Sequence, residues 1–171
     1  MIKANPFEDH RGYFCRIFCE EELNEIGFHK RVVQINQSMT KLRGSIRGMH
    51  FQYPPKAETK IVKCLSGSIY DVAVDLRQDS PTFLQWYGET LSADNMKLFF
   101  IPEGFAHGFQ TLEDNSEILY LHSEFYSKEH ESGIRYNDPA LNIEWTLKLT
   151  DISERDKNLP LIDKNFQGLI L

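Results

Sequence analysis

Short runs of β-branched and aromatic residues, separated by turn residues, dominate the hydrophobic pattern of this chain. The runs predicted as strands are residues 31–38, 45–52, 59–64, 68–76, 85–92, 97–101 and 117–126. Ser66-Gly67 and Asp79-Ser80-Pro81 have the composition of turns. One early helix is predicted over residues 20–26, closed by Gly27 at a position that favours a left-handed cap. Short strands at roughly ten-residue spacing predict an all-β sandwich or barrel. The tail after Glu144 is predicted to mix short helical turns with loops.

The predicted strand 117–126 has an unusual inward face. Because alternate residues of a strand share a face, one face carries Ile118, Tyr120, His122, Glu124 and Tyr126. Such a face is too polar for a dry core. It favours a wet cavity, and a small barrel interior can hold one small ligand.

The size of the chain, 171 residues, predicts a single domain over residues 1–171. Its net charge of −6 and the lack of a basic stripe argue against nucleic-acid binding. No apolar run approaches the roughly 20 residues that a membrane helix needs, and no signal segment stands at the amino terminus. Three cysteines, an odd number, predict free thiols in a reducing, cytoplasmic compartment.

His50 and Lys60 are the strongest candidates for chemistry. His50 shares a short predicted strand with Arg47 and Gln52, and Lys60 stands on what reads as the adjacent strand. Burying several polar groups without partners costs about 1–3 kcal/mol each, so a purely structural core would not gather them. A histidine and a lysine that face one cavity can remove a proton beside a ketone and hold the enolate oxygen that results.

A metal site is the main competing interpretation of this barrel. Metal-binding cupins usually supply a His-x-His pair, a following glutamate and a later histidine. Here Phe51 and Gln52 follow His50, so the second ligand is missing, and His50 with His107 alone would make a poor site. Cys15 and Cys19 are four apart with no second ligand pair. We therefore expect no metal.

Other candidates are weaker when taken singly. Tyr120 is either an ordinary strand aromatic or a proton donor opposite His50. Asp156 is either a loop acid, a helix cap, or the group that orients the His50 imidazole, as in a catalytic triad. Three arginines have side chains suited to binding phosphate: Arg11, Arg47 and Arg155. For each of them, taken singly, an exposed surface charge is the simpler interpretation.

Several longer motifs make the chain recognisable. They are Gln34-Ile35-Asn36-Gln37-Ser38, Arg47-Gly48-Met49-His50-Phe51-Gln52, Lys60-Ile61-Val62, Asp71-Val72-Ala73-Val74-Asp75-Leu76-Arg77, Ile101-Pro102-Glu103-Gly104-Phe105-Ala106-His107-Gly108-Phe109 and Ser153-Glu154-Arg155-Asp156. With them the chain closely resembles the dTDP-4-dehydrorhamnose 3,5-epimerase family of nucleotide-sugar enzymes, from Asp9 to Asp163. Two departures are Arg16, where the family commonly has a glutamate that helps bind the nucleotide, and Tyr136, which replaces a common tryptophan.

The resemblance implies a cupin-like double-stranded β-helix, or jelly roll, that needs no metal and forms a homodimer. It implies that His50 is the base, Asp156 its orienting partner, Lys60 the group that stabilises the enolate, and Tyr120 the donor on the opposite face. Tyr126 matches a tyrosine beside the nucleotide base. Positions that match sugar-nucleotide contacts are Arg11, Gln34, Asn36, Arg47, His107, Glu131 and Arg155.

The reaction predicted from these expectations is an isomerisation. It inverts C3, C5 or both in a nucleoside-diphosphate 4-keto-6-deoxyhexose. It needs no redox cofactor, and the chain has no dinucleotide fingerprint. Two alternatives stay open: a single-centre epimerase or ketoisomerase on a related nucleotide sugar, and a non-catalytic nucleotide-sugar binding protein on the same fold.

Overall fold

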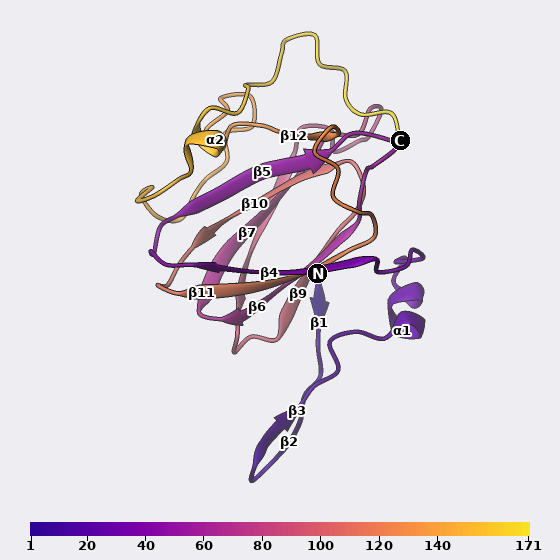
Figure 1. The fold of residues 1–171 in the computed structure, drawn as a ribbon, viewed down its shortest axis with the longest axis vertical. Helices are drawn as coiled ribbons and strands as arrows, with labels where there is room; N and C mark the ends of the chain where they lie inside the picture. The colour runs from indigo at the N-terminus through magenta and orange to yellow at the C-terminus, as the bar shows by residue number, and fades with distance from the viewer.

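The computed structural model describes residues 1–171 as two facing five-stranded antiparallel sheets, a separate hairpin and two short helices. One sheet has the order β1-β9-β6-β11-β4 and the other the order β12-β5-β10-β7-β8, which is a jelly-roll arrangement (Figure 1). The first contains β1 (Ile2–Lys3), β9 (Lys97–Ile101), β6 (Lys60–Ser66), β11 (Ser116–His122) and β4 (Gln34–Thr40). The second contains β12 (Glu131–Gly133), β5 (Ile46–Gln52), β10 (Phe105–Thr111), β7 (Ser68–Asp75) and β8 (Trp86–Ser92). The hairpin is β2 (Phe7–Asp9) with β3 (Gly12–Phe14), and the helices are α1 (Glu20–Glu25) and α2 (Glu154–Lys157).

The predicted all-β class is confirmed, and each predicted strand corresponds to an observed one, with shifted ends in all but the strand 97–101. The helix predicted over 20–26 is α1, and Gly27 follows it with a φ of +94°. One central strand, β10, was not predicted, because glycines surround its histidine and interrupt the alternation of apolar and polar residues. The strand predicted to reach Tyr126 ends at His122, so Glu124 lies outside it.

A dry core fills one end of the space between the sheets. It contains Val62 and Cys64 of β6, Ile69 of β7, Phe109 of β10 and Ile118 of β11, none more than 3% exposed. Farther along the same inward faces stand His50, Lys60, His107, Tyr120 and His122. The inner faces therefore change from apolar at one end to polar at the other, and the cavity lies at the polar end.

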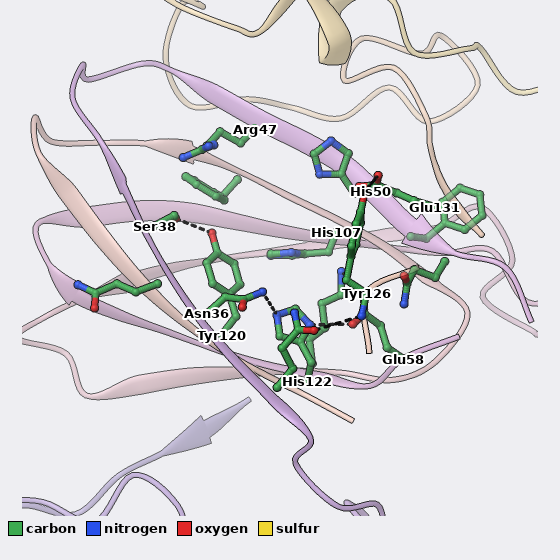
Figure 2. Close-up of a pocket in the computed structure, with 16 residues that line it drawn as sticks. Asn36, Ser38, Arg47, His50, Glu58, His107, Tyr120, His122, Tyr126 and Glu131 are labelled. Carbon is green, nitrogen blue, oxygen red and sulfur yellow. Dashed lines mark hydrogen bonds and ion pairs between the residues drawn. The ribbon is translucent and has the colours of Figure 1, made fainter. Parts of the chain in front are cut away.

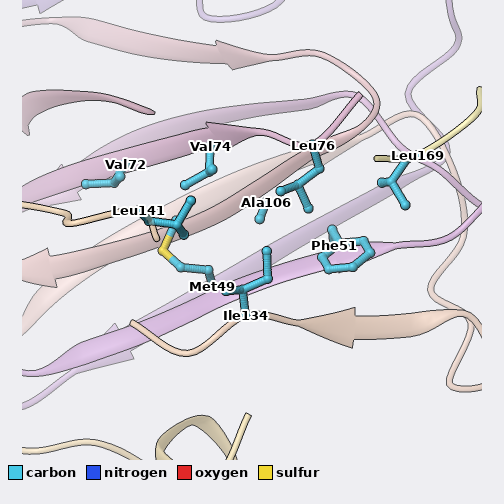
Figure 3. Packing of buried hydrophobic residues seen from close by; sticks show 9 residues of the cluster. All are labelled: Met49, Phe51, Val72, Val74, Leu76, Ala106, Ile134, Leu141 and Leu169. Atoms are coloured by element: carbon cyan, nitrogen blue, oxygen red, sulfur yellow. The ribbon is translucent and has the colours of Figure 1, made fainter. Parts of the chain in front are cut away.

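Each sheet buries part of its outer face under other parts of the chain. Sheet β12-β5-β10-β7-β8 packs a cluster around Met49 and Phe51 against Leu141 and Leu169 of the carboxyl-terminal tail (Figure 3). The other sheet packs Ile61 and Leu121 against α1 and the amino-terminal segment. The inward-facing polar residues of β5 and β6 thus stand on strands that are fixed from behind.

The β2–β3 hairpin extends away from both sheets (Figure 1). Its aromatic side chains Phe7, Tyr13 and Phe14 are between 62% and 73% exposed. No helix in the fold is both long and apolar enough to cross a membrane.

Candidate functional site

A cavity of about 570 Å³ opens between the two sheets at their polar end (Figure 2). Most of its lining is polar. The lining residues are Gln34, Asn36, Gln37, Ser38, Arg47, His50, Phe51, Gln52, Glu58, Lys60, His107, Phe109, Tyr120, His122, Tyr126 and Glu131. Side chains from distant parts of the sequence therefore meet in one place, where they can surround a small polar molecule.

His50 stands on β5 and is held by Asp156. The imidazole Nε2 lies 2.7 Å from Asp156 Oδ1, and the second carboxylate oxygen accepts the Gly48 backbone N–H at 3.1 Å. Burial alone would raise the pKa of Asp156, but the hydrogen bonds from His50 and Gly48 outweigh it and hold that pKa below its ordinary value. An ionised Asp156 accepts a hydrogen bond from Nε2–H, which leaves Nδ1 as the unprotonated nitrogen of neutral His50.

The position of Asp156 is set by the residues just before it in the sequence. Ser153 caps α2, and its hydroxyl accepts the Asp156 backbone N–H at 3.0 Å. This capping interaction is typical of a serine three residues before an acid. The aspartate is thus the third residue of a single helical turn and points back to β5.

Close approach of β5 and β10 brings His50 opposite His107 in the sheet register. A Cβ on Gly48 would lie 2.5 Å from the Gly108 Cα, so only glycine fits where these paired strands approach each other so closely. The His107 Nε2 lies 2.6 Å from Asp71 Oδ1, and Asp71 is fully buried. Burial raises the pKa of Asp71, while the neighbouring His107 opposes that shift.

Tyr120 faces the cavity from β11, on the sheet opposite His50. Its hydroxyl is 3.0 Å from the Ser38 hydroxyl. Burial raises the pKa of Tyr120 to about 12, so the phenol stays protonated at neutral pH. An acid on one wall and a base on the other is the arrangement that inversion at carbon requires.

Lys60 lies on the same wall as Tyr120, which corrects the expectation that it stands on a strand adjacent to His50. Strands β5 and β6 are neighbours in sequence but belong to opposite sheets. The Lys60 ammonium pairs with Glu58 at 2.9 Å. The other Glu58 oxygen lies 2.7 Å from His122 Nδ1.

Other predicted contacts form the rim of the cavity. The Tyr126 hydroxyl donates to Glu131 at 2.8 Å, and Arg155 pairs with the other Glu131 oxygen at 2.6 Å. The Gln34 side chain accepts the Tyr126 backbone N–H at 3.2 Å. Arg47 lies between this cavity and a neighbouring hollow that Arg155, His50 and Asp156 also line.

Arg11 is not part of the cavity within one chain. Its guanidinium pairs with Asp9 in the β2–β3 hairpin, where both side chains are exposed. Arg16 pairs with Glu22 at 2.7 Å, also outside the cavity.

Three partners of cavity residues escaped prediction: Ser38 and Glu58, which line the cavity, and Asp71, which is buried behind His107. Ser38 and Asp71 lie inside motifs that were noticed, but nothing in the sequence pairs them with Tyr120 and His107. Glu58 precedes β6 outside any motif, and its only signal is its place two residues before Lys60. No group of three or more His, Cys, Asp or Glu side chains converges as a metal-ligand set would.

Comparison with known proteins identifies the family of this chain. The family model described as dTDP-4-dehydrorhamnose 3,5-epimerase matches residues 1–164. A dTDP-4-dehydrorhamnose 3,5-epimerase of Methanothermobacter thermautotrophicus is 44% identical over 168 residues, which cover 96% of this chain and 90% of the relative.

Two solved structures of similar proteins are named for different activities. A dTDP-6-deoxy-D-glucose-3,5-epimerase of Legionella pneumophila, in complex with dTDP-4-keto-L-rhamnose, has a TM-score of 0.91 at 37% identity and covers 99% of this chain and 92% of its own. A 3′-monoepimerase of Streptomyces bikiniensis, in complex with dTDP-quinovose, has a TM-score of 0.86 at 30% identity, with coverages of 94% and 81%. The match along nearly the whole sequence, together with the shared fold, shows that the chain belongs to the dTDP-4-dehydrorhamnose 3,5-epimerase family of isomerases.

Proposed function

We propose that this protein inverts C3 and C5 of a dTDP-linked 4-keto-6-deoxyhexose through enolate intermediates. The observation that carries the proposal is the pairing of His50 with Asp156 on one sheet and the position of Tyr120 on the sheet that faces it. The protons on C3 and C5 both flank the C4 ketone. One base, one donor and one site for the enolate oxygen can therefore serve both centres.

His50 is the base in this proposal. Asp156 keeps the proton on Nε2, so that Nδ1 has a free lone pair, and stabilises the imidazolium that forms when a carbon-bound proton is taken. General acid–base help of this kind is typically worth 10²–10⁴-fold.

Lys60 holds the developing C4 oxygen. A preorganised donor aimed at that oxygen typically contributes about 3–4 kcal/mol to the transition state. Tyr120 then delivers its hydroxyl proton to the opposite face of the carbon, and the configuration inverts. The cycle closes when water reprotonates the phenolate and removes the proton from His50.

The nucleotide end of the substrate lies at the rim in this proposal. Arg47 and Arg155 suit phosphate oxygens because their guanidinium forks match them. Tyr126, supported by Glu131 and Gln34, stands where an aromatic base can be recognised. Relatives bound to dTDP sugars support dTDP as the nucleotide. Asn36 and His107 complete the set of substrate contacts inside the cavity.

A homodimer would complete each site. The β2–β3 hairpin exposes the aromatic side chains of Phe7, Tyr13 and Phe14, and a group of exposed apolar side chains can mark a protein–protein contact. We infer that a partner subunit covers these aromatics and receives Arg11 beside its own cavity.

Three unpaired thiols support a reducing, cytoplasmic compartment.

Solvent deuterium exchange into dTDP-4-keto-6-deoxyglucose, read by NMR, tests the proposed reaction. Deuterium at C3 and C5 with inversion at both is the expected result. Exchange at C3 alone would favour single-centre epimerisation, the second candidate, which the 30% identical monoepimerase brings into consideration. No exchange at either carbon would leave only a binding protein.

Sedimentation at micromolar concentration tests the dimer. A species of about twice 20 kDa is expected. A fully active 20 kDa species would contradict the completed-site proposal.

A further inference from the structure

Glu58 is the one protein group that pairs with the Lys60 ammonium. Their charged atoms are 2.9 Å apart, and both side chains are about 10% exposed or less. The second Glu58 oxygen contacts His122 Nδ1 at 2.7 Å, so a single buried carboxylate joins two side chains of the cavity wall. Figure 2 shows Glu58 and His122 together at the cavity, joined by a dashed line.

Strand pairing fixes this geometry. Lys60 and His122 are direct partners across β6 and β11, and Glu58 approaches them from the segment before β6. The other His122 nitrogen, Nε2, lies 3.3 Å from the Asn36 amide nitrogen. The His122 ring also stacks on Tyr120 at a centroid distance of 6.0 Å and an interplanar angle of 25°. His122 is therefore held on three sides and forms a rigid anchor for Glu58.

Electrostatics keeps Glu58 ionised. Burial alone would raise the pKa of Glu58, but the hydrogen bond from His122 and the charge of Lys60 outweigh it and hold that pKa below its ordinary value. The buried negative charge is thus retained at neutral pH. In isolation it would oppose an enolate that forms nearby, so its presence in the cavity wall needs an explanation.

The flexibility of the lysine side chain suggests why a carboxylate stands beside Lys60. The lysine side chain is flexible, and its ammonium is a compact point charge with three donors. One donor on Glu58 limits the ammonium to a small region and leaves the other two free for a substrate oxygen. A loss of about 1 Å in the placement of such a group can cost on the order of 100-fold in rate.

We propose that Glu58 is a positioning residue of the epimerase reaction, which holds the Lys60 ammonium at the place where the enolate oxygen forms, with His122 as its anchor. The inference rests on the proposed function of Lys60. The simpler alternative is that Glu58 and Lys60 are only a buried ion pair that stabilises the β6–β11 wall.

The test combines Glu58→Gln with Lys60→Met in a double-mutant cycle. The Glu58→Gln variant keeps the shape of the side chain and removes the charge, and we expect kcat to fall by about tenfold or more while KM stays within about twofold. In the Lys60→Met background, Glu58→Gln should change kcat by less than about twofold, because its effect acts through the ammonium that is already gone.

Glu89→Gln is the matched control. Glu89 pairs with Lys97 at 3.1 Å on β8 and β9, away from the cavity, and its replacement should leave kcat unchanged. Glu58→Asp is a second variant that keeps the charge but withdraws it by one methylene. Its kcat should lie below that of the parent, and it provides the test if Glu58→Gln does not fold.

Three results would overturn the inference. One is a parental kcat in Glu58→Gln, or in Glu58→Asp if only that variant folds. Another is a rise in KM with kcat unchanged. The third is an equal loss from Glu58→Gln with and without Lys60. A parental kcat in Lys60→Met would instead refute the proposed function of Lys60 itself, so the two failures are distinguishable.

Discussion

Replacement of Asp156 by asparagine is the prediction that the geometry specifies most closely. The two carboxylate oxygens have different partners: Oδ1 faces His50 Nε2 at 2.7 Å and Oδ2 accepts the Gly48 N–H at 3.1 Å. An asparagine has only one acceptor atom. If its oxygen keeps the Gly48 N–H, its NH₂ group must face His50 and donate to Nε2.

That arrangement reverses the imidazole tautomer. With Nε2 accepting, neutral His50 carries its proton on Nδ1, the nitrogen that must be free to act as the base. The opposite amide orientation restores the tautomer but turns the NH₂ group toward the Gly48 N–H. The variant can therefore satisfy one partner or the other, but not both.

The magnitude follows from these contacts. A buried polar group left without its partner costs about 1–3 kcal/mol. In the active arrangement of the variant, with the asparagine oxygen facing His50, both the Gly48 N–H and the asparagine N–H that faces it have no acceptor. The total, about 2–6 kcal/mol, corresponds to roughly 30- to 2 × 10⁴-fold in kcat at about 1.4 kcal/mol per tenfold. We expect a loss near the middle of that range, with the thermal midpoint little changed, since an asparagine fills the same volume.

The assay is deuterium exchange at C3 and C5 under saturating substrate, with ¹⁵N NMR of His50 to read its tautomer. Asp163→Asn, on an exposed aspartate that caps a turn in the tail, is the control and should behave as the parent. A variant at Asp156 with parental kcat, or one that loses activity while His50 keeps the Nε2–H tautomer, would refute the reasoning.

Lys60→Met should lower kcat by roughly 100-fold or more with a small change in KM, because the lost contact strengthens as charge develops on the substrate oxygen; a rise in KM alone would mark Lys60 as a simple substrate anchor. Tyr120→Phe should still wash deuterium into the substrate but yield little inverted sugar, and parental rates of inversion would transfer the donor role to another group. Because the pKa of Tyr120 is raised to about 12, the parent should lose no activity through its ionisation below about pH 10. Met49→Ala, at a fully buried position behind β5, should destabilise the fold by about 2–5 kcal/mol in denaturant titration, and a change below 1 kcal/mol would contradict the packing in Figure 3.

The fold class was predictable because alternation and turn chemistry are local signals. The strand 97–101 was predicted with its observed ends, and α1 ends at Glu25, one residue before its predicted end, with the expected Gly27 just after its cap. β10 was missed because Gly108 interrupts its alternation. Gly108 is needed for the close approach of β10 to Gly48 of β5, a requirement that appears only when these two distant strands pair. The continuation past His122 was wrong for a related reason: alternation persists into a loop where no partner strand follows.

The site was predictable at the level of its motifs and less so in its partnerships. The pair formed by His50 and Asp156 spans 106 residues, and the resemblance to a family suggested it where spacing did not. Lys60 was expected beside His50 because strands consecutive in sequence often pair. In a jelly roll they can cross to the facing sheet, which put Lys60 on the opposite wall. Glu58 illustrates the remaining gap, because a single acid before a strand gives no sign of the lysine and histidine it joins.

The central claim is that His50 removes the carbon-bound protons from one wall of the cavity while the donor acts from the other. Deuterium exchange at C3 and C5 in His50→Asn tests it most directly, since asparagine keeps much of the shape and lacks a basic nitrogen. The account predicts that exchange at both carbons falls by at least about 100-fold while a dTDP sugar still binds. Exchange at the parental rate in a folded His50→Asn protein would contradict it.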